Sequence, residues 1–176
     1  MAKESVAAKK HKEIGPKTVT AAIITVSDTR TPRTDESGGA IRAALQGKGH
    51  KVLRYAVCPD EPPRISQELD SSLATGCDVV IINGGTGIAQ RDVTIETVSL
   101  RLEKKLEGFG DIFRQLSYKE IGSSAMLSRA VAGTCQGAMV FCLPGSPEAV
   151  RLAMDKLILP ELGHIVGLIK GHRPPR

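Results

Sequence analysis

The chain contains four apolar runs that predict β-strands. Three of these runs are continuous rather than alternating, which is typical of strands buried on both faces of a parallel sheet. The predicted strands are Thr20–Val26, Lys51–Cys58, Asp78–Asn83 and Gly137–Leu143.

Between and after these runs, apolar residues recur at helical spacing. Ile65, Leu69 and Leu73 show this spacing behind an entrance at Asp60–Pro63, where prolines fit the first helical turn. The other predicted helices begin at Asp35 and at Pro147, or cover residues 95–106, 109–116 and 122–132. Pro160 is expected to break or kink the last helical region, because proline lacks a backbone N–H.

Strands that alternate with helices predict the α/β class, here a three-layer α/β/α architecture with a mostly parallel sheet and right-handed crossovers. Residues 18–170 contain no visible linker and are predicted to form one domain. A flexible basic leader is expected over residues 1–17 and a flexible tail over residues 171–176. Aromatic residues make up only 3% of the chain, so its core must be built mainly from Ala, Val, Ile and Leu. The apolar stripe at 109–116 is expected in that core or in a subunit interface.

The formal net charge of +5 lies in the two tails. Five lysines against two glutamates precede residue 18, and Lys170, Arg173 and Arg176 lie at the other end, so residues 18–169 are close to neutral. Nucleic-acid binding favours basic residues clustered on an ordered face, so no nucleic-acid partner is expected. One alternative is a nucleic-acid accessory protein that acts through its basic tails. The simpler interpretation is that both tails are solvated chain ends.

Other classes of protein find little support in the sequence. The first residues contain no apolar run typical of a signal peptide, and no run in the sequence approaches the ~18 apolar residues of a membrane helix. We therefore expect a cytoplasmic protein without a membrane partner. The four cysteines and four histidines lack metal-ligand spacing, and the cysteines are therefore expected in the core.

If the predicted strands are parallel, the segments that follow them meet at one edge of the sheet. Open α/β sheets bind ligands at that carboxyl edge. The segments are Ser27–Arg30, Pro59–Glu61, Gly84–Gly87 and Pro144–Pro147. We therefore expect Ser27 and Asp28 among the residues that bind the ligand.

The glycine-rich segment Gly84–Gly87 offers backbone N–H groups that can approach an anion closely, with a helix start behind them. Phosphate suits such a site, and Arg91, with Arg30 or Arg33, can neutralise further negative charge. The motif alone is equally compatible with a tight turn. Its position directly after a buried strand favours phosphate binding.

Asp60 and Asp92 each follow a predicted strand end by a few residues. Two carboxylates that converge on a phosphate site would hold Mg²⁺, a hard cation that prefers oxygen ligands. Aspartate is also a preferred N-cap, worth about 1 kcal/mol, so capping alone explains both positions equally well. Ser37 and Ser146 have the same two interpretations, as helix caps or as ligands of an anion.

Taken in order, several short motifs resemble one known family. They are S-D-T-R at 27–30, D-E-S-G at 35–38, P-D-E at 59–61, G-G-T-G-I-A-Q-R-D-V-T at 84–94, G-F-G-D at 108–111, L-S-R-A at 127–130 and L-P-G-S-P at 143–147. Each motif is unspecific alone. The ordered set spans roughly residues 18–168 and resembles the molybdenum cofactor biosynthesis protein B and molybdopterin adenylyltransferase family.

This resemblance implies a molybdopterin-binding fold and a Mg²⁺-dependent transfer of AMP from ATP to the terminal phosphate of molybdopterin, with release of pyrophosphate. Asp60 and Asp92 would be its catalytic and metal-binding residues. The residues implied for substrate or phosphate binding are Gly84, Gly85, Thr86, Gly87, Ser128, Gly145 and Ser146. The family also suggests a homo-oligomer, either a trimer or a hexamer. A protein that binds or carries molybdopterin without turnover is the alternative.

Overall fold

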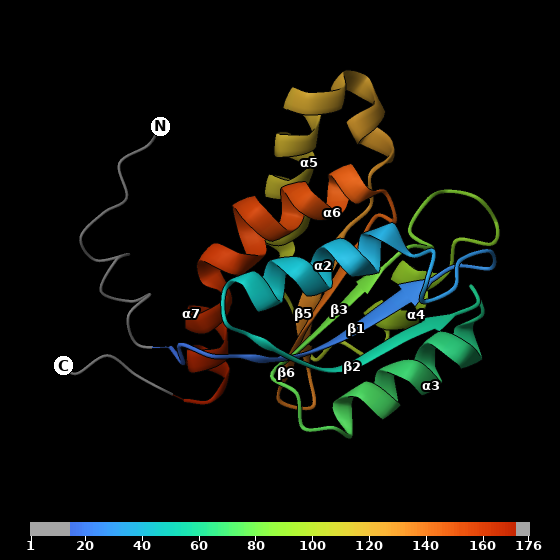
Figure 1. Cartoon of the computed structure of the whole chain (residues 1–176). Coiled ribbons are helices and arrows are strands. Elements are labelled where there is room, and N and C mark those ends of the chain that lie inside the picture. Colours follow the sequence, from blue (N-terminus) through green and yellow to red (C-terminus); the bar gives the residue numbers. More distant parts are fainter. Residues whose placement is uncertain (1–14, 172–176) are drawn as a thin grey trace.

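A six-stranded sheet between two layers of helices forms the body of the protein (Figure 1). The computed structural model describes residues 15–171. In these residues the strand order is β2-β1-β3-β6-β5-β4, and the first four strands in that order run parallel. The predicted three-layer α/β/α class with a mostly parallel sheet is confirmed. The strands are β1 (Thr20–Val26), β2 (Lys51–Cys58), β3 (Val79–Asn83), β4 (Lys104–Lys105), β5 (Val131–Cys135) and β6 (Ala138–Leu143).

The helices divide between the two faces of the sheet. One face is covered by α2 (Glu36–Gly47), α5 (Glu107–Ile121), α6 (Pro147–Ala153) and α7 (Leu159–Ile169), and the other by α3 (Pro62–Leu73) and α4 (Thr94–Ser99). A 3-10 helix, η1 (Gly122–Leu127), follows α5, and a π-helical turn, η2 (Met154–Ile158), joins α6 to α7. The η2 turn ends at Ile158, two positions before Pro160, so the helical region does not break at this proline but passes through a π-helical turn before it.

Alternation along the buried strands builds two separate hydrophobic clusters. In β1, Ile23 packs in the cluster under α2 and α6, whereas Ile24 packs in the cluster under α3. Phe109 joins the first cluster, with its ring centroid 5.1 Å from that of Phe141. The four cysteines are buried and unpaired, as their spacing predicted. Burial raises the pKa of the Cys58 thiol to about 11, so this group behaves as a small apolar side chain.

The predicted helix over residues 95–106 is wrong beyond Ser99, where α4 ends. The chain turns instead into the short strand β4, whose Lys104 and Lys105 pair antiparallel with β5. Backbone hydrogen bonds from Glu103 N to Thr134 O (2.8 Å) and from Leu106 N to Ala132 O (2.7 Å) continue this pairing. These bonds complete an otherwise open edge of β5, which the local apolar spacing does not reveal.

The predicted short helix over residues 122–132 is also only partly correct. The 3-10 helix η1 ends at Leu127, and Val131–Cys135 forms a strand antiparallel to β6. The hairpin turns at Gln136 and Gly137, whose φ angles are +49° and +78°. A two-residue turn with positive φ at both positions matches the natural twist of a hairpin, and for that reason the last strand begins at Ala138 rather than Gly137.

Most of the predicted leader and tail, residues 1–14 and 172–176, lies outside the described residues. The domain boundaries at 18 and 170 therefore stay predictions. Within the described part of the chain, no helix is long and apolar enough to cross a bilayer.

Asp78 ties the amino end of the sheet together. Its carboxylate accepts hydrogen bonds of 2.8 Å from both the backbone N–H and the hydroxyl of Thr20, and it pairs with Lys170 of the last helical turn. Burial by itself raises the pKa of this carboxyl, but the bonds from Lys170 and Thr20 outweigh burial and hold the pKa below its ordinary value.

Because the folded-state pKa of Asp78 is depressed, its contribution to stability is complete above the unfolded pKa of about 3.9 and disappears as the pH falls through the lower folded value. We expect Asp78→Asn to lower the unfolding free energy at neutral pH by about 1–3 kcal/mol. Urea titrations at pH 7 and near pH 2 measure this difference, which should shrink at the acid end. Asp155→Asn at an exposed position is the control. If the loss of unfolding free energy in Asp78→Asn is the same at both pH values, the prediction is contradicted.

Candidate functional site

The turns that follow β1, β2, β3 and β6 lie together at the carboxyl edge of the sheet, at the right-hand end of Figure 1. Ser27 N donates to Cys58 O at 2.8 Å, and Gly84 N donates to Leu143 O at 3.1 Å, so these ends are joined directly. The chain leaves β1 for one side of the sheet and β3 for the other, which makes the β1/β3 boundary the switch point where open α/β sheets bind ligands. The expected convergence of these four segments is confirmed.

The loop after β3 packs so closely on its surroundings that only glycine fits at two positions. Gly84 and Gly85 have φ angles of +92° and +61°. A Cβ on Gly84 would lie closer than 3.0 Å to the Val26 carbonyl, and a Cβ on Gly85 equally close to Thr94 Oγ1 and Asp60 Oδ2. The glycines therefore bring the loop backbone directly against the end of β1 and against Asp60.

Three successive backbone N–H groups in this loop are available to a ligand. Among residues 15–171, no carbonyl or side chain accepts a hydrogen bond from the N–H of Gly85, Thr86 or Gly87. Thr86 is nevertheless buried, and a buried backbone donor needs a partner. Successive free N–H groups in a turn form a concave site that suits an anion such as phosphate.

Asp60 and Asp92 both lie against this loop. Asp60 Oδ1 accepts from Val93 N at 3.3 Å, and Asp92 Oδ2 accepts from Ala89 N at 3.0 Å. The carboxylate of Asp92 occupies the space beside Gly87, where a Cβ would lie 2.6 Å from Oδ2. Neither carboxylate caps the helix that follows it, since α3 and α4 begin at other residues without a side-chain cap. Own-helix capping is therefore the wrong explanation for both aspartates.

The electrostatics around Asp60 favour binding of a cation. Burial raises the pKa of this carboxyl, and the neighbouring charges of Asp92 and Asp28 raise it further, against the opposing effects of Val93 N and Arg91. Asp28 itself pairs with Arg91 at 2.6 Å and accepts from Asp60 N at 3.3 Å. Arg91, expected to neutralise ligand charge, thus neutralises Asp28 in this structure.

The hydroxyl of Thr94 is a second indication that the site binds a ligand with oxygen acceptors. Its hydroxyl is fully buried and has no hydrogen-bond partner, while its backbone N–H donates to Gly85 O at 3.0 Å. This hydroxyl and the Asp60 carboxylate flank the same point beside Gly85. A buried hydroxyl without a partner costs about 1–3 kcal/mol, a cost that a bound ligand would relieve.

The donor set fits Mg²⁺ bound together with a nucleotide better than a metal cage made of protein alone. The described residues contain no group of three or more His, Cys, Asp or Glu that could hold a metal ion. Mg²⁺ usually takes one or two carboxylates and completes its octahedron with water and substrate phosphates. Asp60 and Asp92, beside free N–H groups suited to phosphate, meet that requirement.

The predicted serines Ser27, Ser37 and Ser146 lie at the same edge, and each makes side-chain hydrogen bonds within the protein. Ser37 Oγ donates to Gly145 O at 2.7 Å, which joins the start of α2 to the turn after β6. Ser146 Oγ accepts from Ala149 N at 3.2 Å, so its capping role is confirmed. Ser27 Oγ accepts from the backbone of its own turn, at Thr29 and Arg30. Direct contact of these serines with a ligand stays a prediction.

Arg129 is a residue of this site that sequence reasoning missed. It directly follows Ser128, and its Nε donates to Thr86 O at 2.9 Å. The same guanidinium makes bonds of 2.6 and 3.1 Å to the two carboxylate oxygens of Glu96. These contacts attach the segment of Ser128 to the glycine loop. The L-S-R-A motif contains Arg129, but only its tertiary contacts distinguish it from an ordinary surface arginine.

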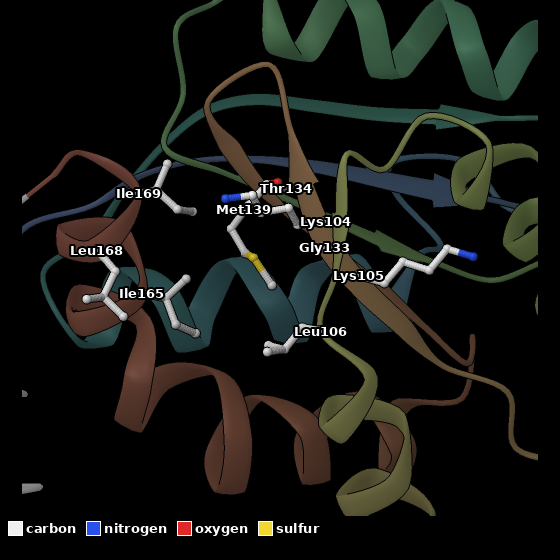
Figure 2. A pocket seen from close by; sticks show the side chains of 9 residues that line it. All are labelled: Lys104, Lys105, Leu106, Gly133, Thr134, Met139, Ile165, Leu168 and Ile169. Carbon is white, nitrogen blue, oxygen red and sulfur yellow. The ribbon is translucent and has the colours of Figure 1, made fainter.

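A cavity of about 270 Å³ opens at this edge between the ends of β1 and β2. Its lining includes Ser27, Asp28 and Arg30. A second cavity, of about 190 Å³, lies at the opposite end of the sheet between α7 and the β4–β5 edge (Figure 2). Its wall is largely apolar, with Leu106 and Met139 turned inward, so this second cavity does not suit a phosphorylated ligand.

The fold and the site together define a class of three-layer α/β protein. At the carboxyl edge of its parallel sheet lie a glycine-rich loop with free backbone N–H groups and two carboxylates. Residues 22–164 match the sequence profile of the family described as "Probable molybdopterin binding domain". The chain therefore belongs to the molybdopterin-binding-domain family, and the resemblance seen in its motifs is confirmed.

Individual relatives agree with this membership. The chain is 54% identical over 157 residues to molybdenum cofactor biosynthesis protein B of Bacillus cereus, which covers 88% of this chain and 93% of the relative. A crystal structure of a molybdenum cofactor biosynthesis protein B is 53% identical, with a TM-score of 0.86 over 88% of this chain and 98% of the other. The tungsten cofactor synthesizing protein MoaB from Pyrococcus furiosus is 36% identical, with a TM-score of 0.79 over 90% and 99% of the two chains.

Proposed function

We propose that this protein acts in molybdenum cofactor biosynthesis as a molybdopterin adenylyltransferase, which transfers AMP from ATP to the terminal phosphate of molybdopterin. The observation that carries the proposal is the arrangement of Asp60 and Asp92 against the free N–H groups of Gly85, Thr86 and Gly87. This arrangement suits a phosphate chain and its counter-ion at one point of the sheet edge.

The proposed reaction needs charge neutralisation more than a strong general base. The attacking oxygen belongs to a phosphate that is already anionic at neutral pH. It forms a new bond to the α-phosphorus of ATP, while the bond from that phosphorus to the pyrophosphate oxygen breaks. In such transfers, catalysis is mainly positioning and electrostatic stabilisation of the phosphoryl oxygens.

Each group at the edge has a separate task in this proposal. The loop N–H groups bind phosphate oxygens, and Asp60 and Asp92 hold the cation. Mg²⁺ bound there would neutralise charge on the nucleotide phosphates as the bond to pyrophosphate breaks. The hydroxyl of Thr94 lies beside Asp60 at Gly85, where it would donate to a ligand oxygen or to the carboxylate. Ser128 and the turn at Gly145 are the proposed contacts of molybdopterin.

A pyrophosphate-release assay tests the proposal. Purified protein, ATP, Mg²⁺ and molybdopterin should yield one pyrophosphate for each adenylylated molybdopterin, and omission of Mg²⁺ or of molybdopterin should abolish release. Molybdopterin binding without pyrophosphate release would overturn the transferase and favour a carrier protein.

The expected trimer or hexamer is also part of the proposal. Exposed apolar side chains gather on α5 and η1, which project from the body of the protein in Figure 1. They include Ile112, Tyr118, Ile121 and Met126. A partner copy would bury such side chains.

A further inference from the structure

Arg129 joins its own segment to two elements that are far from it in the sequence, the glycine loop and α4. Its side chain reaches the carbonyl of Thr86 in the glycine loop, 43 positions away, and Glu96 in α4, 33 positions away. The planar guanidinium makes all three bonds at once, with Nε on the carbonyl and the two terminal nitrogens on the carboxylate. A lysine cannot reproduce this arrangement, because its ammonium is a single point of charge without a rigid fork.

The bond to the Thr86 carbonyl fixes the direction of the next N–H group. The carbonyl of Thr86 and the N–H of Gly87 belong to one planar trans peptide, so they point in opposite directions. Holding the carbonyl on the Arg129 side therefore directs the Gly87 N–H to the other side of the loop. The Gly87 N–H is one of the three that have no acceptor within residues 15–171.

The ion pair keeps the guanidinium in this position at neutral pH. The hydrogen bond from Arg129 lowers the pKa of the Glu96 carboxyl, which is therefore ionised under ordinary conditions. The pKa of Arg129 is raised by its bond to Glu96 and by the charges of Glu96 and Asp92. Glu96 thus supplies an anchor for Arg129 on α4, outside the loop that Arg129 orients.

We propose that Arg129 is a positioning residue, which with Glu96 orients the Thr86–Gly87 peptide so that the Gly87 N–H faces a bound phosphate. Arg129 acts through the loop backbone rather than by touching the ligand. The inference rests on the proposed phosphate-binding function of the loop.

The test compares Arg129→Met and Arg129→Lys with the control Arg101→Met. Arg101 pairs with Asp70 in an ion pair of matched exposure: the two side chains are 30% and 56% exposed, against 32% and 56% for Arg129 and Glu96. Exposed pairs of this kind contribute about 0–1 kcal/mol, so the melting temperature should change little in all three variants. Two further readouts are the ¹⁵N order parameter of the Gly87 amide in ligand-free protein and the affinity for Mg²⁺-pyrophosphate.

Both Arg129 variants should lower the Gly87 order parameter from about 0.85 toward about 0.6 in the absence of ligand. They should weaken pyrophosphate binding roughly tenfold, the effect of one lost hydrogen bond to a charged group. Arg101→Met should change neither quantity. An unchanged Gly87 amide in Arg129→Met, full recovery in Arg129→Lys, or an equal effect of Arg101→Met would overturn the positioning role.

The two proposals fail in different ways. If the wild-type protein binds no pyrophosphate through residues 85–87, the proposed function loses its phosphate site. The order parameter of the ligand-free Arg129 variants still decides whether Arg129 orients the loop, because it requires no ligand.

Discussion

Replacing either Asp60 or Asp92 by asparagine should reduce adenylyl transfer at least about 100-fold and leave the melting temperature close to that of the wild type. Removing one preorganised electrostatic contact from an active site typically costs about 10²–10³ in rate. Asparagine keeps an acceptor oxygen for the Val93 or Ala89 N–H, so the local hydrogen bonds survive. What disappears is the negative charge that the proposed cation requires.

Stability should not suffer, because the folded protein already places like charges close together. Asp92 and Asp28 both raise the pKa of Asp60, so each neutral variant relieves repulsion. Initial rates of pyrophosphate release over a range of Mg²⁺ concentrations, together with thermal melts, measure both effects. Asp155→Asn at an exposed position on η2 is the matched control. Wild-type rates in both active-site variants would refute a cation-binding role for these carboxylates.

The raised pKa of Asp60 adds a pH signature to the same experiment. Mg²⁺ requires the ionised carboxylate of Asp60, and the pKa of this carboxyl is raised above the ordinary aspartate value of about 3.9. As the pH is lowered, the affinity of the protein for Mg²⁺ should therefore begin to fall at a higher pH than an ordinary aspartate would give. In Asp60→Asn this contribution to the pH dependence of Mg²⁺ affinity should be absent.

Gly84→Ala should lower the unfolding free energy by about 2–5 kcal/mol and abolish pyrophosphate binding. The φ angle of Gly84 is +92°, and a left-handed conformation costs an L-residue about 1–2 kcal/mol. The added Cβ would also meet the Val26 carbonyl closer than 3.0 Å, where the end of β1 cannot move without breaking the sheet. Overpacking of this kind adds about 1–3 kcal/mol.

Gly76→Ala separates the two contributions. Gly76 also has a positive φ, +71°, but nothing lies within 4 Å of an added Cβ. This variant should lose only the conformational part, about 1–2 kcal/mol. Chemical denaturation of both variants measures the difference. If Gly84→Ala and Gly76→Ala are equally stable, the close approach between the glycine loop and β1 is not the constraint that the structure indicates.

Local sequence patterns are sufficient to predict the α/β class and the convergence of the polar turns. Continuous apolar runs such as Thr20–Val26 require burial on both faces, and buried parallel strands necessarily end at one edge. These features predict that Asp60, Asp92 and Gly84–Gly87 lie close together. Helix starts with a local signal, such as Ser146–Pro147, were equally accessible, because a cap and its helix are neighbours in the chain.

Which strands are neighbours and which charged side chains pair follows, in contrast, from three-dimensional packing. The spacing of apolar residues indicates that a segment is buried, but it does not indicate which strand that segment pairs with. For this reason the sequence did not predict β4 and β5, nor the strand order β2-β1-β3-β6-β5-β4. The same limit hid Arg129, whose role depends on a carbonyl 43 positions away. Contacts of this kind are fixed by the packing of whole elements, and no local pattern in the chain encodes them.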